Sequence, residues 1–433
     1  MKIISLIAFS LLSFGACVDG TIEIPEDTPI LIEAPEPEPP GELDNLVIGV
    51  YWPPTWEQVT DAQFDMLADA HVDMLQYVIT YTEAQNMTIL DKSRDRGMRS
   101  IIFDARAYGS DAELADMVNA YRSHAGLGGY YIKDEPSPAE LDWAAAIYNK
   151  IYELDADHIP HVNLFPSFAT HFTEGIDYKN DYMQGWINRV GGAARMKFLS
   201  LDVYPFMADG TFNPVYYHEL DRLRSVALEN GDIRTSAYLQ SLGVEGAYRR
   251  PNEHELRYNV YSMLAYGIKY PVWFTYCTPD NTVNETFTEA IIDRDGNKTD
   301  LYVPFKTLNG EMKALGSKLF VMQSQIVYHT GEGVPSGVES LPAEYFVQPD
   351  NPNEDLLIAQ LKNWPEGGRN YAMIVNKSLT EAKELTFNIA GWITDMDEVS
   401  KTTGSENPIT INEGKVTLTF MPGEGRLFGF KPF

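Results

Sequence analysis

The regular alternation of short apolar runs with amphipathic segments constrains the fold of this chain more than any other feature. Between residues 46 and 320, apolar stretches of strand length are each followed by a segment with apolar residues at helical spacing. The expected strands cover residues 46–52, 72–79, 99–105, 128–134, 161–165, 198–204, 235–240 and 271–276. The expected helices cover residues 55–70, 83–96, 112–124, 139–154, 182–190, 215–229, 253–266 and 305–320.

Eight strand–helix pairs of this kind predict an α/β fold, a (β/α)8 TIM barrel. The strands are apolar almost throughout, which indicates burial on both faces, as parallel sheets require. A barrel of eight such units needs roughly 250 residues, and this region is of that size. A doubly wound open sheet is the alternative, but no Gly-rich phosphate-binding fingerprint follows the first expected strand.

The pattern changes after residue 330. Short alternating runs separated by turn residues replace the helical spacing, which predicts a small antiparallel β-sandwich. These runs cover residues 356–361, 371–376, 384–389, 415–420 and 425–430. We therefore expect a barrel domain over residues 44–325 and a sandwich over residues 326–433, with the sandwich packed on the barrel.

The first 43 residues have the composition of an export signal and a tether. Lys2 precedes an apolar core over residues 3–14, which is shorter than the roughly 20 residues that span a bilayer. Phe14-Gly15-Ala16-Cys17 resembles a bacterial lipobox, which predicts cleavage after residue 16 and lipidation of Cys17. An ordinary signal peptide is the alternative. Residues 17–43 are rich in Pro and Glu and are expected to form an extended tether.

The lipobox predicts a lipoprotein of the bacterial outer membrane, at the cell surface or the periplasmic face, with the lipid anchor as its membrane contact. A net charge of −29 argues against nucleic acid or anionic headgroups as partners. No metal or cofactor is expected. His158 and His161 lack further ligands nearby, residues 293–297 have their glycine at the wrong position for a calcium loop, and Cys277 is expected to be an inert buried residue.

Residues 126–136, Gly-Leu-Gly-Gly-Tyr-Tyr-Ile-Lys-Asp-Glu-Pro, hold the most informative polar group. An aromatic strand ends in two adjacent carboxylates, Asp134 and Glu135, and Pro136 stops the strand. Barrels of parallel strands place their chemistry at this carboxyl end. A carboxylic acid flanked by aromatic rings suits the protonation of a glycosidic oxygen.

The other strand ends deliver aromatic, amide and carboxylate side chains to the same rim. Sugars stack their apolar faces on aromatic rings, while amides and carboxylates hold their hydroxyl groups. The expected carbohydrate-binding residues are Tyr51, Trp52, Asp104, Asp134, Asn163, Tyr204, Gln240, Phe274 and Tyr276. Simpler roles remain open for some of the rim residues. Asp134 or Asp202 could cap the next helix, Glu135 could form a salt bridge, and Trp52 or Tyr276 could pack in the core.

Four strand-end motifs carry a resemblance to a known family. They are Tyr-Tyr-Ile-Lys-Asp-Glu-Pro at residues 130–136, Leu-Asp-Val-Tyr-Pro-Phe at 201–206, Ala-Tyr-Leu-Gln-Ser-Leu-Gly at 237–243 and Trp-Phe-Thr-Tyr-Cys-Thr-Pro at 273–279. With these motifs the chain resembles the clan-A glycoside hydrolases of Bacteroidetes lipoproteins, which join a barrel to a C-terminal sandwich. The resemblance implies hydrolysis of a poly- or oligosaccharide by carboxylate acid/base chemistry.

The chain departs from that family at the catalytic pair. The clan uses an Asn-Glu pair on the fourth strand as the source of the acid, and here Glu135 matches the Glu while Asp134 replaces the Asn. The clan nucleophile is a Glu that ends the seventh strand, where this chain has Gln240. We expect Asp202 to supply the second carboxylate, with Glu245 as the alternative. A separation near 5 Å between the two carboxyl groups predicts retention of configuration, and roughly 6.5–9.5 Å predicts inversion.

Three functions are consistent with these patterns. The first is an exported, lipid-anchored glycoside hydrolase with Glu135 as the general acid. The second is a surface glycan-binding protein on a degenerate hydrolase barrel, which Gln240 favours. The third is a structural or adhesive lipoprotein whose sandwich binds another protein.

Overall fold

The computed structural model describes residues 44–169, 172, 175–335 and 337–432. The expected export signal, the lipidation site Cys17 and the tether lie outside the described residues. Within them, no helix is both long enough and apolar enough to cross a lipid bilayer.

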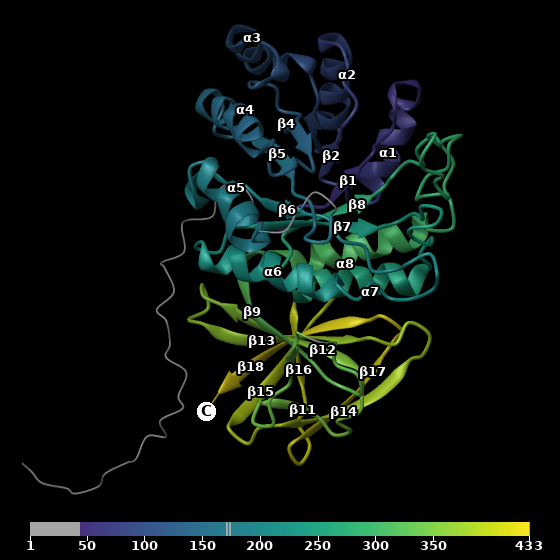
Figure 1. Ribbon diagram of the computed structural model, residues 1–433. Helices are drawn as coiled ribbons and strands as arrows, with labels where there is room; N and C mark the ends of the chain where they lie inside the picture. The colour runs from purple at the N-terminus through teal and green to yellow at the C-terminus, as the bar shows by residue number, and fades with distance from the viewer. Residues whose placement is uncertain (1–43, 170–171, 173–174, 336, 433) are drawn as a thin grey trace, which may run out of the picture. The chain divides into compact units, whose positions relative to one another are not determined.

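Eight parallel strands form the barrel (Figure 1). They are β1 (Gly49–Tyr51), β2 (Met74–Gln76), β3 (Arg99–Ile102), β4 (Leu127–Asp134), β5 (Ile159–Asn163), β6 (Leu199–Leu201), β7 (Thr235–Gln240) and β8 (Tyr270–Phe274). Their order is β5-β4-β3-β2-β1-β8-β7-β6. A parallel bridge between Leu164 and Leu201 joins the two edges and closes the ring. The predicted (β/α)8 fold is confirmed.

A helix follows each strand. The helices are α1 (Asp61–Asp69), α2 (Glu83–Arg94), α3 (Asp111–Tyr121), α4 (Leu141–Leu154), α5 (Gln184–Arg189), α6 (Tyr216–Glu229), α7 (Glu253–Ala265) and α8 (Tyr302–Val321). Shorter turns are η1 (Trp56–Gln58), η2 (Ala105–Tyr108), η3 (Tyr178–Met183) and η4 (Ala193–Arg195). The first helix starts later than expected because Thr60, whose hydroxyl accepts the Gln63 N–H, is its N-cap.

Tyrosines fill much of the barrel interior. Tyr270 and Tyr238 are both bonded to the amide of Gln76, and Tyr238 also bonds His161, so that a polar chain runs through the lumen. A Cβ atom at Gly49 would lie 2.6 Å from the ring of Tyr270, which explains the absence of a side chain there. These bonds give the hydroxyls of Tyr270 and Tyr238 and both ends of the Gln76 amide a partner, as burial demands.

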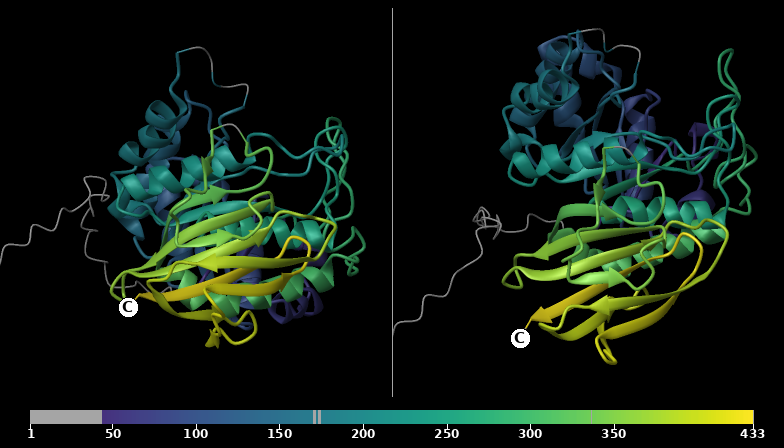
Figure 2. Two further views of the ribbon diagram at one scale, coloured as in Figure 1. Left: turned by 90° about the horizontal axis from the view of Figure 1, so that it is seen from below. Right: turned by 60° about the horizontal axis from the view of Figure 1, so that its bottom comes forward.

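Two sheets follow the barrel, and both are drawn in green to yellow in Figure 2. Their strands are β9 (Met322–His329), β10 (Glu339–Ser340), β11 (Val347–Pro349), β12 (Leu356–Asn363), β13 (Arg369–Asn376), β14 (Lys383–Ile389), β15 (Ile393–Val399), β16 (Glu406–Ile409), β17 (Lys415–Phe420) and β18 (Gly425–Pro432). One sheet has the order β10-β9-β12-β13-β18-β15-β16, and the other has the order β11-β14-β17. All pairs except β9 with β10 are antiparallel.

Alternate side chains along β12 show that the two faces of the larger sheet pack against different parts of the protein. Ile358 belongs to the core between the two sheets, together with Phe387 of β14. Leu357 and Leu361, on the opposite face of β12, belong to the core that also includes the barrel helices. The sandwich therefore packs against the barrel through one face of its larger sheet, in keeping with contacts of α7 with β12, β13 and β18.

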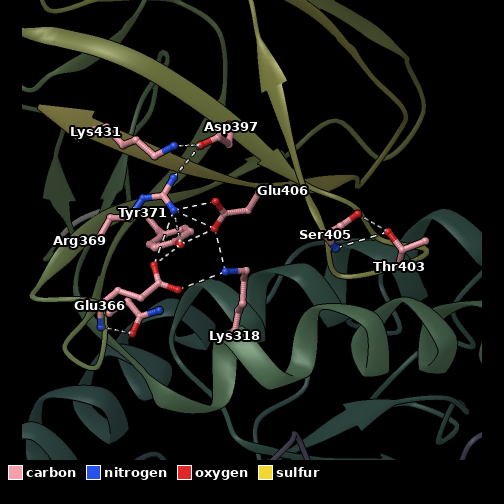
Figure 3. Close-up of polar contacts among 10 residues, drawn as sticks. Lys318, Glu366, Arg369, Tyr371, Asp397, Thr403, Ser405, Glu406 and Lys431 are labelled. Carbon is pink, nitrogen blue, oxygen red and sulfur yellow. Dashed lines mark hydrogen bonds and ion pairs between the residues drawn. The ribbon is translucent and has the colours of Figure 1, made fainter.

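A network of ion pairs joins α8 to this sheet (Figure 3). Lys318 of α8 lies 2.7 Å from a carboxylate oxygen of Glu406, and Arg369 of β13 lies 2.7 Å from the other. Arg369 also pairs with Asp397 at 2.9 Å, and the hydroxyl of Tyr371 donates to Glu406 at 2.6 Å. Burial opposes ionisation of Glu406, yet Arg369, Lys318 and Tyr371 lower its pKa to about 2. We call these five residues the junction network.

Candidate active site

The end of β4 carries a bulge that sets the direction of its acids. Ile132 has no counterpart in β5, because the register shifts between Tyr131 and Lys133. Tyr131 faces the lumen, Ile132 packs on the helix side, and Lys133 lies 3.8 Å from Glu140. The extra residue therefore returns Asp134 to the lumen, where Tyr51 donates a hydrogen bond to it at 3.1 Å.

Glu135 turns back to the same side as Asp134. In a regular strand, neighbouring side chains point to opposite faces. Glu135 has φ +49°, in the left-handed region that residues other than glycine rarely adopt. Its N–H donates to the carbonyl of Asn163 at 2.9 Å, which fixes this turn to the end of β5. Strained backbone of this kind is found preferentially at functional sites.

Asn163 links two of the acids. Its Nδ2 donates to Asp202 Oδ1 at 2.9 Å and to Asp134 Oδ1 at 3.2 Å. The hydroxyl of Ser200 donates to Asn163 Oδ1 at 2.9 Å, which fixes the amide orientation. The ends of β4, β5 and β6 are thus tied together, and Asp134, Glu135 and Asp202 form a group that we call the acid cluster.

The carboxyl groups of Glu135 and Asp202 lie within hydrogen-bonding reach of each other. Burial, followed by repulsion from Asp202 and Asp134, raises the pKa of Glu135. Burial and Asp134 also raise the pKa of Asp202, although the bonds from Asn163 and Glu135 oppose this rise. The two carboxyl groups therefore titrate as a pair, and together they retain a proton more readily than isolated carboxyl groups do. Burial raises the pKa of Asp134 as well.

Aromatic rings line the lumen beside the acid cluster. The ring of Phe274 lies 5.4 Å from that of Tyr51 and 5.1 Å from that of Tyr204. Tyr248, from the β7–α7 loop, packs edge-on against Tyr204 at 5.2 Å. Burial, Asp202 and Glu135 raise the pKa of Tyr248 to about 12, so its hydroxyl stays protonated beside the acids.

Trp52 lies at the edge of this group. Its ring centroid is 6.5 Å from that of Tyr51, and its φ is +54°. It lines a small hollow together with Tyr77 and Tyr81, among others. Of the twelve expected catalytic and binding residues, the acid cluster and its surroundings thus include Tyr51, Trp52, Asp134, Glu135, Asn163, Asp202, Tyr204 and Phe274.

Gln240 ends β7, and its side-chain amide is hydrogen-bonded to backbone groups of two loops. Its Oε1 accepts the N–H of Phe206 at 3.0 Å, and its Nε2 donates to the carbonyls of Phe206 and Arg249 at 3.2 and 2.8 Å. The residue is 1% exposed. Gln240 therefore joins the β6–α6 and β7–α7 loops, and these bonds occupy the amide that was expected to bind substrate.

Three other expected residues have their contacts elsewhere. Asp104 caps η2, pairs with Arg106 at 2.6 Å and accepts the hydroxyl of Tyr121. Tyr276 packs on Phe305 of α8, in the core on the helix side. Glu245 is exposed in the β7–α7 loop and makes none of the hydrogen bonds that join the acids in the described part of the chain.

Sequence reasoning missed several tyrosines at the site. Tyr131 and Tyr238 face the lumen, and Asp134 acts on the pKa of both. Tyr182 donates to the carbonyl of Pro136 at 2.6 Å and accepts the N–H of Phe165, so it holds the β4–α4 loop behind Glu135. Period-two alternation back from the strand ends could have identified Tyr238, but the bulge in β4 hides Tyr131.

The described residues contain no group of three or more His, Cys, Asp or Glu side chains suited to hold a metal ion. Cys277 is buried, and burial raises the pKa of its thiol, as expected for an inert cysteine.

Comparison with solved structures identifies glycoside hydrolases. A β-galactosidase from Bacillus circulans sp. alkalophilus has a TM-score of 0.59 at 9% identity, over 90% of this chain and 99% of that one. A glycoside hydrolase family 5 protein from Bacteroides vulgatus ATCC 8482 has a TM-score of 0.53 at 12% identity, over 89% of each chain. At such identities the likeness shows the fold alone, a (β/α)8 barrel. No family model matches the sequence, and no curated protein matches it.

Proposed function

We propose that the chain is an exported, lipid-anchored glycoside hydrolase in which Glu135 is the general acid and Asp202 the base or nucleophile. The observation that supports this most is the close pair of Glu135 and Asp202, two acids with raised pKa values at the carboxyl end of a barrel and among aromatic rings. A proton held at neutral pH is what a leaving glycosidic oxygen must receive. The barrel fold shared with glycoside hydrolases agrees with this function.

The proton balance of the reaction follows from the two roles. Glu135 transfers its proton to the leaving oxygen as the glycosidic bond breaks. Asp202 either takes a proton from the attacking water or bonds to the anomeric carbon itself. Both outcomes need more space than the hydrogen-bonded pair leaves, since retention uses about 5 Å and inversion more. A bound sugar must therefore separate the pair, and the separation it produces decides the stereochemistry.

Substitution of each acid tests the proposal. Glu135→Gln keeps the shape but cannot give a proton, and we expect its kcat to fall by about 100-fold or more. Asp202→Asn should show a comparable loss. Glu245→Gln is the matched control, an exposed acid of a rim loop that lacks contact with the cluster, and it should retain turnover within about twofold. The assay uses neutral oligo- and polysaccharides with detection of reducing ends. Full turnover by Glu135→Gln would refute the assignment.

A glycan-binding protein without catalysis is the second candidate. Gln240 favours it, because an amide stands at the end of β7 where the resembled family has its catalytic carboxylate, and this amide is engaged by backbone groups. Sugar binding by the unmodified protein, with no product released from any glycan of the panel, would select this function over hydrolysis.

Export and lipidation are a separate part of the proposal. The apolar segment at residues 3–14 followed by Cys17 supports them. In a Gram-negative host, Cys17→Ala should abolish incorporation of labelled fatty acid and release the protein from the membrane fraction. Equal labelling of both forms would exclude Cys17 as the anchor.

A further inference from the structure

Two half-exposed aromatic rings lie side by side beyond the acid cluster. Tyr108 and Trp143 are 43% and 42% exposed, and their ring centroids are 5.2 Å apart. Tyr108 ends η2, which follows β3, and Trp143 lies in the first turn of α4, shortly after Glu135. Two successive βα connections thus place their aromatic residues together at the rim of the barrel.

A series of aromatic residues, linked by ring contacts and then by hydroxyl groups, leads from this pair to the acids. Phe103 lies 5.4 Å from Tyr108 and 5.5 Å from Tyr131. Tyr131 faces the lumen and bonds Tyr51, which in turn donates to Asp134. The exposed pair is therefore the outer end of the same aromatic wall that lines the candidate active site.

Tyr108 is tethered to the barrel although its ring is partly exposed. The hydroxyl of Tyr108 donates to the backbone carbonyl of Ile132, so the ring is fixed to β4 near the bulge. A ring that is already immobile loses little conformational entropy when a ligand stacks on it. Exposed apolar rings arranged in this way suit the C–H faces of sugar rings, which need no charge to bind.

Two other tryptophans are exposed, and they differ in their relation to the site. Trp56 contacts Tyr81, which lines the same hollow as Trp52 at the edge of the acid cluster. Trp392 of the sandwich is 46% exposed and packs on Phe346 at 5.8 Å, far along the chain from the barrel rim. Trp392 thus has a similar exposure and an aromatic neighbour, but no series of ring contacts in the described part of the chain connects it to the acid cluster.

We propose that Tyr108 and Trp143 form a distal sugar-binding platform, and that the substrate is a chain of several neutral sugar units that extends from the acid cluster to this platform. This inference rests on the proposed function of the cluster. The sugar units far from the cleaved bond would bind at the rim between β3 and α4. The sugar units on either side of that bond would bind in the lumen.

The test measures binding as a function of chain length. The probes are neutral gluco-, xylo-, manno-, arabino- and galacto-oligosaccharides of one to six units, with the Glu135→Gln variant used throughout to prevent turnover. Calorimetry on the full folded protein should show affinity that rises with length. Trp143→Ala should remove this rise and weaken binding of the longest bound oligosaccharide by about 5- to 10-fold, the effect of one aromatic contact. Binding of the shortest ligand should not change.

Trp392→Ala is the matched control, with similar exposure and a similar aromatic neighbour, and it should bind every length as the parent does. Equal affinity of Trp143→Ala and Trp392→Ala for the longest ligand would refute the platform while leaving the acid cluster assignment intact. If no probe or parent polysaccharide is bound by the parent or cleaved by the unmodified enzyme, the proposed function fails and the platform with it.

Discussion

Two groups of acidic residues in this protein have opposite surroundings. In the acid cluster, Asp134, Glu135 and Asp202 lie together with tyrosines around them. Burial raises the pKa of all three, and repulsion from neighbouring acids adds to the rise for Glu135 and Asp202. In the junction network, Glu406 faces Arg369 and Lys318, which lower its pKa. Both groups are largely enclosed, so the difference lies in their partners.

The contrast separates acids that support function from acids that support the fold. A carboxyl group whose pKa is raised on folding destabilises the folded state at neutral pH, whereas one whose pKa is lowered stabilises it. The junction network therefore contributes to holding the sandwich on the barrel. The acid cluster reduces stability, and it keeps a proton available where chemistry can use it.

The largest effect on stability is expected from removal of Arg369. Arg369→Met leaves Asp397 and Glu406 without their shared cation in a mostly buried place, and breaking such a pair costs about 3 kcal/mol of unfolding free energy. Denaturant unfolding at pH 7 measures this change. Lys415→Met, which breaks the exposed pair with Asp350, is the control and should leave the unfolding free energy nearly unchanged.

The loss of unfolding free energy caused by Arg369→Met should be smaller at acidic pH than at pH 7. The lowered pKa of Glu406 gives stability that is present above the unfolded value of about 4.3 and is lost as the pH falls towards about 2. The parent protein should therefore lose stability over this range, while the variant changes less. A deficit that is the same at pH 7 and pH 3 would contradict the role assigned to the network.

Gln240→Glu is expected to have the next largest effect on the unfolding free energy. The new carboxyl group would face the carbonyl oxygens of Phe206 and Arg249, which now accept from the amide, and we expect a loss of about 2 kcal/mol. The loss of unfolding free energy should grow from pH 5 to pH 8. The new buried carboxyl group would have a raised pKa, so in this pH range it would hold a proton in the folded protein and release it in the unfolded chain. A variant that is as stable as the parent at pH 8, with higher turnover, would show that β7 can take a catalytic acid.

Glu135→Gln should act in the opposite direction and stabilise the protein. The raised pKa of Glu135 means that the folded protein binds a proton that the unfolded chain releases above pH of about 4.3, so stability falls as the pH rises. Removing this group should add about 1 kcal/mol at pH 8 and little at pH 4. Thermal unfolding at the two pH values checks it, and a variant less stable than the parent at pH 8 would contradict the account.

The smallest effect is expected from Tyr51→Phe. The hydroxyl of Tyr51 donates to Asp134 at 3.1 Å, and its loss should cost about 0.5–1 kcal/mol at pH 8. Tyr204→Phe is a useful partner variant, because no hydrogen bond from its hydroxyl to the acids is seen among the described residues. Equal stability of the two variants would show that the bond to Asp134 contributes nothing.

The elements of the barrel could be predicted because their signals are local. Apolar runs predicted the strands, and helical spacing predicted the helices. In the structure, Ser110 and Asn252 cap α3 and α7, a local signal that agrees with this spacing. The sequence also placed Glu135 and Asp202 at strand ends on one rim. Parallel strands then bring such residues together whatever their separation along the chain.

The rest of the site depends on features that no local pattern reveals. The bulge at Ile132 and the left-handed turn at Glu135 decide where the acids point, and the partners of both come from β5. The amide of Gln240 is used by two loops that meet it only in the folded protein. The bond of Asp104 to Arg106 is local, and the Asp-Ala-Arg sequence could have indicated a cap there.

The direct test of the account is a titration of the Glu135 carboxyl group, with isotope-labelled glutamate and carbon NMR, in the parent protein and in Asp202→Asn. We predict that the group titrates well above its ordinary pKa of about 4.3 in the parent, and closer to that value once Asp202 carries no charge. An ordinary value in the parent that the substitution leaves unchanged would contradict the claim that the two acids share a proton.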